Sequence, residues 1–217
     1  MARQPPSSVA GSIERASTIA AGTQSDAPAL AALARDDPDA RVRTVALTRL
    51  VRDSPRRLSA PVWRVAVSDP DAAVRRRAAE LAPRLGRAAS SAALLQLLRD
   101  ANAWVAEAAA YALGEHPAPS RAARAALVRT AREHSDPLVR EAAVAALGAQ
   151  GDPASLPAVL AACDDKPAIR RRAVLALAAF DGPEVEARLQ RALGDSDWQV
   201  RQAAEDLLAD APPPEPA

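Results

Sequence analysis

Hydrophobic and polar positions alternate along this chain in a pattern that returns roughly every 30–34 residues, the period range of helical repeats. One stretch shows the unit well. Val139, Ala143 and Leu147 recur every four residues and form a single apolar stripe, which predicts an amphipathic helix. Asp136 stands at the expected N-cap of that helix, and Gly148 is expected to end it.

The same stripe occurs six times. It begins with a β-branched residue in every unit: Val42, Val74, Val105, Val139, Ile169 and Val200. Four residues later every unit has an alanine: Ala46, Ala78, Ala109, Ala143, Ala173 and Ala204. The next position is apolar again: Leu50, Ala82, Leu113, Leu147, Leu177 and Leu208. Another helical segment precedes each striped helix. We therefore expect an all-α fold, a right-handed α-solenoid of about six antiparallel helix pairs.

Turn and cap residues divide the chain into three parts. We expect residues 1–24, which are polar and rich in Ser, Pro and Gly, to be a flexible tail in which Ile13 to Ala21 could form a marginal helix. Residues 25–210 form the repeat array, and residues 211–217 form a Pro-rich tail that cannot continue a helix. The expected helix starts lie near Asp26, Ser59, Asp71, Ser90, Asn102, Pro119, Asp136, Asp152, Lys166, Gly182 and Asp197.

The pattern Asp-Pro-x-Val-Arg-x-Ala-Ala-x-x-Ala-Leu-Gly, matched best at residues 136–148, resembles the HEAT repeat. It is most similar to the short variety found in phycobilisome lyase subunits. The resemblance extends over roughly residues 26–209 and implies an array of stacked helix pairs. This family includes scaffolds, lyase-like proteins and a metalloenzyme. The resemblance therefore predicts the fold and leaves the function open.

Charge and cysteine content narrow the function classes. The 217 residues include 28 basic and 27 acidic side chains, for a net charge of +1. This balance argues against the basic cleft that duplex binding needs, and so against a HEAT-like DNA glycosylase and nucleic-acid binding in general. Cys163 is the only cysteine, and its alanine neighbours predict a small buried residue. No apolar run is long enough to span a membrane, and we expect a cytoplasmic protein.

Two columns of opposite charge accompany the stripe. An arginine follows its first residue in five units: Arg43, Arg75, Arg140, Arg170 and Arg201. An aspartate stands five residues before that first residue: Asp37, Asp69, Asp100, Asp164 and Asp195. Ala106 and His134 are the exceptions. The arginines could form an anion-binding ladder, or each could bridge to an Asp or a helix-end carbonyl. We favour the structural ladder, because paired columns of opposite sign neutralise each other.

Metal chemistry is the next alternative. Deoxyhypusine hydroxylase is built from similar repeats and holds its iron with His-Glu pairs, which the resemblance would place at the start of the second helices. Here the best match reads Ala106-Glu107, and no other unit has a His-Glu pair. The two histidines, His116 and His134, do not form a set. Because a dinuclear site needs several converging ligands, we predict no metal and no cofactor.

The remaining candidate is the solvent face of the second helices, which line the concave side of HEAT-like arrays. Helical spacing places aromatic and apolar residues in the middle units and charged residues on the flanks. The candidate residues are Arg76, Trp104, Glu107, Tyr111, Leu138, Glu141, Arg171 and Leu175. An apolar centre with a charged rim is typical of a protein interface. We therefore predict a monomeric, non-enzymatic scaffold that binds a protein or peptide segment there.

Three alternatives to this interpretation stay open, and the first is nucleic-acid binding of the HEAT-like DNA glycosylase type. The chain could be a lyase-like or chaperone-like accessory enzyme that acts on a cofactor-bearing protein. Trp104 could also fold over a neighbouring helix end and merely pack, since a first-turn tryptophan can lie along its own helix.

Overall fold

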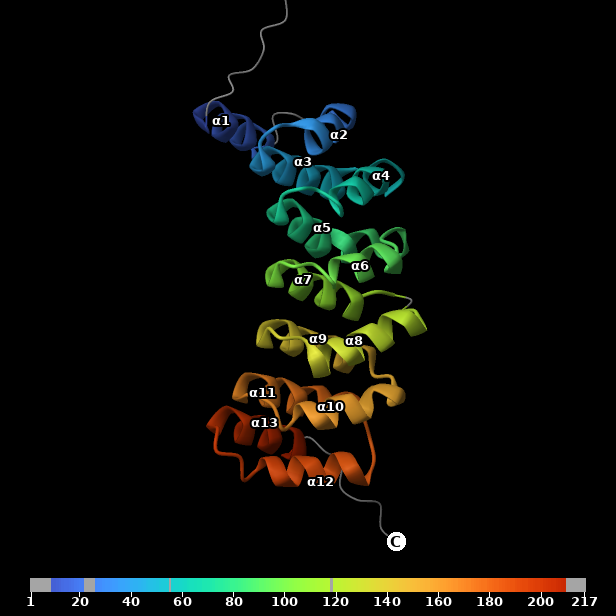
Figure 1. The fold of residues 1–217 in the computed structure, drawn as a ribbon, viewed down its shortest axis with the longest axis vertical. Helices are drawn as coiled ribbons and strands as arrows, with labels where there is room; N and C mark the ends of the chain where they lie inside the picture. The colour runs from blue at the N-terminus through green and yellow to red at the C-terminus, as the bar shows by residue number, and fades with distance from the viewer. Residues whose placement is uncertain (1–8, 22–25, 55, 118, 210–217) are drawn as a thin grey trace, which may run out of the picture. The chain divides into compact units, whose positions relative to one another are not determined.

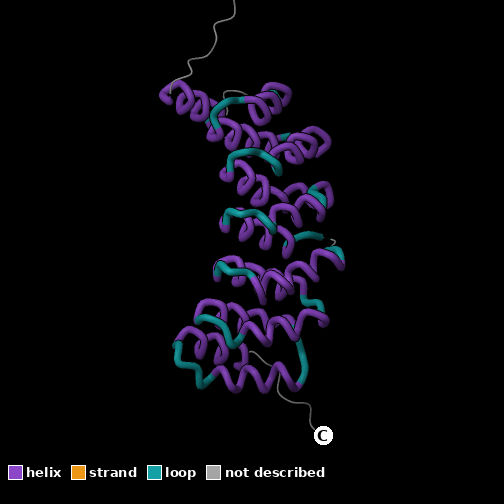
Figure 2. Tube along the Cα trace, in the orientation of Figure 1, coloured by secondary structure: helices purple, strands orange, loops and turns teal. Residues whose placement is uncertain are grey.

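The computed structural model describes residues 9–21, 26–54, 56–117 and 119–209. These residues form thirteen α-helices and no strand, as Figures 1 and 2 show. A single helix, α1 (Val9–Ala20), precedes six helix pairs, which confirms the predicted all-α repeat fold. The chain divides into two compact units, described separately below. The N-terminal unit holds residues 1–112 and 116–118, and the C-terminal unit holds residues 113–115 and 119–217.

The helix pairs follow one another in chain order, blue to green and then yellow to red in Figure 1. After α1 come α2 (Ala27–Asp36) with α3 (Ala40–Asp53), α4 (Arg56–Ala66) with α5 (Ala72–Leu85), and α6 (Ser91–Leu97) with α7 (Ala103–Gly114). The later pairs are α8 (Arg121–Glu133) with α9 (Pro137–Gln150), α10 (Leu156–Ala162) with α11 (Pro167–Ala176), and α12 (Pro183–Ala192) with α13 (Trp198–Ala209). Three short 3-10 turns are η1 (Gly86–Ala88), η2 (Pro153–Ser155) and η3 (Leu177–Ala179).

The repeated stripe forms the core of each unit. All six alanines of the column are 0 % exposed, and the β-branched residues that start the stripe are 0–1 % exposed. Second helices pack directly on one another, α3 on α5 in the N-terminal unit, and α9 on α11 and α11 on α13 in the C-terminal unit. An alanine at each contact allows such helices to approach closely.

Gly148 has a different role from the one predicted. Helix α9 does not end there but continues to Gln150, and Gly151 provides the left-handed cap with φ +58°. A Cβ on Gly148 would lie 2.7 Å from the Cβ of Ala176 on α11. Glycine is therefore needed inside α9 for close approach to its neighbour, and the chain reversal is made three residues later.

Most second helices start at the predicted caps. The Asp136 carboxylate accepts a hydrogen bond from the Leu138 amide at 2.9 Å. Equivalent bonds, at 2.8–3.0 Å, are accepted by the side chains of Asp39, Asp71, Asn102 and Asp197. Each bond satisfies one of the amides that a helix start leaves without a partner. At α11 the cap residue is Lys166, whose side chain makes no such bond.

The predicted N-terminal tail contains a helix. Val9–Ala20 forms α1, which packs on α3 and buries Ile19 completely. Local composition suggested a tail because Ser, Thr and Gly disfavour an isolated helix, whereas burial against a neighbour stabilises it. Helix α4 also starts earlier than predicted, at Arg56, with Pro61 inside it. The predicted tail 211–217 lies outside the described residues.

The alanine column predicts a strict size limit. Replacing Ala143 by Leu should overpack the middle of α9 and lower the free energy of unfolding by about 1–3 kcal/mol. Ala149→Leu, at an exposed position of the same helix, is the control and should change it by less than about 0.5 kcal/mol. Denaturant unfolding of both variants checks this. An unchanged midpoint for Ala143→Leu would mean that the position tolerates bulk and that close packing is not the constraint.

Candidate functional site

The arginine column makes one repeated contact, which Arg140 illustrates. Its Nε and Nη2 atoms donate to the two carboxylate oxygens of Asp165 at 2.8 and 2.9 Å. Its Nη1 donates to the backbone carbonyls of His134 and Ser135 at 2.8 and 3.2 Å. One guanidinium therefore ties the loop before its own helix to the loop of the next pair. The bidentate geometry is the strong form of this ion pair.

The same contact of one arginine with a loop aspartate and with backbone carbonyls, called the clamp below, recurs along the column. The arginines Arg43, Arg75 and Arg170 hold Asp69, Asp100 and Asp195 with bonds of 2.6–3.0 Å. Hydrogen bonds from these guanidinium groups lower the pKa values of Asp100, Asp165 and Asp195. Arg201, on the last helix, donates to the carbonyls of Asp195 and Ser196. These contacts favour the structural interpretation of the column over an anion-binding ladder.

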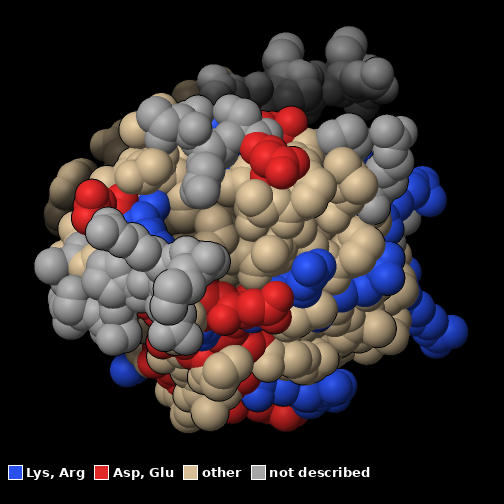
Figure 3. Space-filling view, turned by 90° about the horizontal axis from the view of Figure 1, so that it is seen from above, with Lys and Arg blue, Asp and Glu red and all other residues tan. Residues whose placement is uncertain are grey.

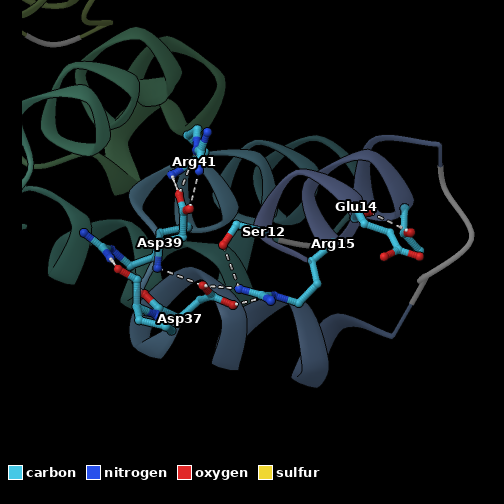
Figure 4. Close-up of polar contacts among 9 residues, drawn as sticks. Ser12, Glu14, Arg15, Asp37, Asp39 and Arg41 are labelled. Atoms are coloured by element: carbon cyan, nitrogen blue, oxygen red, sulfur yellow. Dashed lines mark hydrogen bonds and ion pairs between the residues drawn. The ribbon is translucent and has the colours of Figure 1, made fainter. Parts of the chain in front are cut away.

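An additional clamp member comes from α1 and was missed from the sequence. Arg15 Nε and Nη2 lie 3.3 Å from the Asp37 carboxylate, and Nη2 is also 3.3 Å from the Ser12 hydroxyl (Figure 4). Asp37 also accepts from the Asp39 amide at 2.9 Å. No valine precedes Arg15, so it does not match the repeat pattern that identified the other arginines.

One aspartate of the predicted column is displaced. Arg140 pairs with Asp165, whereas Asp164 pairs with Arg188 of α12 at 2.7 Å. The loop before α11 differs from the others. Asp165 accepts a hydrogen bond from the amide of the next residue, Lys166, whereas the aspartates of other units accept one from the amide two residues later. At His134, the other exception, Nδ1 accepts from the Asp136 amide at 3.1 Å. This neutral ring keeps the loop-bracing bond that aspartate makes in other units.

The candidate surface in the N-terminal unit lies on α7 and α5. Trp104 and Tyr111 are 55 % and 56 % exposed, and Glu107 between them is half-buried. Arg76 of α5 lies over the Trp104 ring, 5.3 Å from its centroid, and also pairs with Glu80 at 2.9 Å. The ring is therefore oriented by a cation–π contact but is not covered.

The predicted residues of the C-terminal unit lie on α9 and α11. Leu138 and Glu141 of α9 are half-buried, and Arg171 and Leu175 of α11 are exposed. Glu141 is 3.4 Å from Arg172 of α11, a long contact for an ion pair. The sequence analysis predicts one surface from these residues together with Trp104 and Tyr111. Trp104 and Tyr111 belong to the N-terminal unit and the four residues of α9 and α11 to the C-terminal unit.

The three tryptophans have different environments. Trp63 is 0 % exposed, and its Nε1 donates to the Ala78 carbonyl at 2.6 Å, so it belongs to the core. Trp198 is 64 % exposed at the first position of α13. Trp104 and Trp198 are therefore both exposed. They differ in that the helix of Trp104 also carries a second exposed aromatic residue, Tyr111.

The surface charges, the single cysteine and the potential metal ligands give further information on the chemistry of the chain. Acidic and basic side chains occur together on the face drawn in Figure 3. Cys163 is buried, and burial raises the pKa of its thiol, which disfavours the nucleophilic thiolate. Among the described residues, no three His, Cys, Asp or Glu side chains are placed to hold a metal ion. None of the described helices has the length and apolarity needed to cross a bilayer.

Comparison with known families identifies the repeats. Residues 118–169 and 159–215 match the family described as HEAT repeats. The sequence of this part of the chain therefore contains HEAT repeats. The matched ranges fall almost entirely in the C-terminal unit, where Asp136 and the α9 stripe first indicated the pattern. No curated protein matches the chain in sequence.

Solved structures extend the fold similarity to both units. The phycocyanin lyase CpcE–CpcF complex from Nostoc is 20 % identical over 96 % of this chain and 80 % of its own, with a TM-score of 0.61. A designed armadillo repeat protein in complex with the peptide (KR)4 is 17 % identical, with a TM-score of 0.60, and the match covers 85 % of this chain and 99 % of that one. A chain of the S. pombe condensin Cnd3–Cnd2 subcomplex is 18 % identical, with a TM-score of 0.63, and the match covers 94 % of this chain and 31 % of that one. At these identities the similarity shows an α-solenoid fold and nothing further.

The clamp predicts a stability effect that is separable from binding. Arg140→Ala removes a bidentate pair whose side chains are only 13 % and 23 % exposed. It should lower the free energy of unfolding by about 1–3 kcal/mol, and it should leave ligand affinity nearly unchanged in the folded protein. Arg129→Ala, which removes an exposed arginine of α8, is the control. Loss of binding with unaltered melting of Arg140→Ala would favour the anion-ladder interpretation instead.

The lowered carboxyl pKa values predict acid sensitivity. The native state holds these aspartates ionised below their ordinary pKa of about 3.9, whereas the unfolded state takes up protons there. The clamp contribution should therefore be complete above that pH and lost as the pH falls below it. Unfolding measured from about pH 6 to about pH 3 should show a smaller decline for Asp165→Asn than for the wild type. Parallel curves would mean that Asp165 titrates alike in both states.

Proposed function

We propose that this protein is a non-enzymatic scaffold that binds a protein or peptide segment on the exposed face of its second helices. Trp104 and Tyr111 on α7 are the proposed anchors, with Glu107 between them and Arg76 at the edge. In the C-terminal unit the matching face consists of Leu138, Glu141, Arg171 and Leu175. This face corresponds to the concave side that the repeat pattern predicts.

One observation on α7 carries the proposal: its small side chains are buried, whereas its large aromatic side chains are exposed. The alanines Ala106, Ala108, Ala109 and Ala110 are buried, while the two aromatic residues of the helix are more than half exposed. Tyr and Trp are the residues most often found as binding hot spots, and both combine a large apolar ring with a polar group. They stand seven residues apart, which places them on one helix face two turns apart.

The structural relatives support a protein ligand. Repeat solenoids are typical of protein-binding scaffolds, and those listed above include a designed protein with a bound peptide and a condensin subcomplex. The lyase-like alternative rests on similarity to the CpcE–CpcF complex, which at 20 % identity concerns the fold alone. The Cys163 thiol does not favour that chemistry, because it is buried and its pKa is raised.

The anchors can be tested by truncation. In a pull-down from the source cell, the double variant Trp104→Ala/Tyr111→Ala should lose a partner that the wild type retains. For that partner, purified, each anchor should contribute about 2 kcal/mol or more to the binding free energy, measured by calorimetry. The physical reason is that large rings desolvated on binding dominate interface energies.

Trp198→Ala is the matched control, because it removes an exposed tryptophan of similar position from another helix. It should leave both the captured proteins and the affinity unchanged. Circular dichroism and melting of all variants establish that they fold. If folded Trp104→Ala/Tyr111→Ala captures the same proteins as the wild type, these residues are not anchors.

A further inference from the structure

A groove lies between α9 and α11 in the C-terminal unit, beside Leu175 of the proposed binding face. It encloses about 330 Å³ and is lined by small apolar residues, with Leu175 and Arg172 beside them. The small residues are Ala145, Gly148, Ala149, Ala176, Ala178 and Ala179. The groove follows from the sequence, because the glycine and alanines that let the helices approach leave no large side chain to fill the space above them.

The charges around the groove are unequal. Of the three arginines at the start of α11, Arg170 is held by Asp195, while Arg171 is exposed and Arg172 is 43 % exposed. Glu141 is the only acidic residue of α9 and α11, and it reaches Arg172 only at 3.4 Å. With the clamp pairs neutralised, this edge carries one net positive charge. Leu175 lies three and four residues after the two arginines and therefore shares their helix face.

We propose that this groove binds an acidic, apolar peptide segment. An apolar side chain of the partner, of the size of leucine or methionine, fills the space over the alanines beside Leu175. A carboxylate of the same segment, about one helical turn away, pairs with the exposed Arg171. The proposal rests on the scaffold function proposed above and assigns a ligand class to the C-terminal part of that face.

The charge asymmetry favours this occupant over the alternatives. A basic segment would face Arg171 and Arg172, and like charges at an interface suppress binding. A purely apolar segment would leave the exposed guanidinium groups without partners while removing their water, which is costly. A segment that carries both an apolar and an acidic side chain satisfies both features of the site.

The experiment is a selection from a library of displayed random peptides, performed on the full chain. The wild type is compared with Arg171→Glu/Arg172→Glu and with Ala149→Phe, which fills the groove. Arg129→Glu/Arg132→Glu and Ala125→Phe are matched controls at exposed positions of α8, with the same changes of charge and size. The variant Trp104→Ala/Tyr111→Ala reports on the other proposed anchors. Melting shows that each variant folds.

We expect the wild type and the controls to enrich peptides that combine Leu, Ile or Met with a nearby Asp or Glu. The peptides selected on Arg171→Glu/Arg172→Glu should carry Lys or Arg in place of Asp or Glu. Ala149→Phe should lower the affinity for a peptide selected on the wild type by about tenfold or more, measured by fluorescence anisotropy. The Trp104→Ala/Tyr111→Ala variant should enrich the same peptides as the wild type.

Other outcomes separate the two proposals. Peptides that are lost with Trp104→Ala/Tyr111→Ala but are unaffected by charge reversal and by Ala149→Phe would overturn the groove and support the α7 anchors. Enrichment of basic or purely apolar peptides on the wild type, or no enrichment on any protein, would also overturn the groove.

Discussion

Close approach of the second helices is the constraint on which the rest of this structure depends. Every unit places alanine at the centre of the buried stripe, and all six alanines are fully buried. At a second contact between α9 and α11, opposite Ala176, even the methyl group of alanine would be too large, and Gly148 stands there. Close spacing also brings the loops of successive pairs within reach of one arginine side chain. The clamps from Arg43 to Asp69 and from Arg140 to Asp165 depend on that spacing.

The same constraint explains why aromatic residues lie on the surface. Most buried positions of α7 hold alanine, and helices packed this closely have no interior site for an indole or a phenol. On α7 the side chains of Trp104 and Tyr111 therefore face solvent. The apolar area that they expose does not contribute to the stability of the fold. Trp63 shows the contrast, because it occurs on a first helix, where the stripe is less regular, and is buried with its Nε1 hydrogen-bonded.

Much of the fold could be predicted from the sequence because repetition averages out local ambiguity. The stripe, the Asp136 cap and the approximate helix starts follow from patterns that occur six times. Features that occur once were not predictable: the packing of α1, the Arg15 contact, and the one-residue shift from Asp164 to Asp165. The groove beside Leu175 was also missed, since it is a property of two helices together, and helical spacing describes only one helix at a time.

The two exceptions in the charged columns, Ala106 and His134, show that the arginine and aspartate of a pair depend on each other. Position 106 is alanine where other units have the clamp arginine, and the following unit has His134 in place of aspartate. An aspartate there would be a half-buried carboxylate without its cation, whereas a neutral histidine still accepts the Asp136 amide. Both columns change together, as expected if their function is mutual neutralisation. Some arginines outside the column also hold a loop aspartate, as Arg188 holds Asp164. Arg76 and Arg171 do not, and both are exposed. In the scaffold proposed above, these two charges rather than the column would therefore influence the choice of partner.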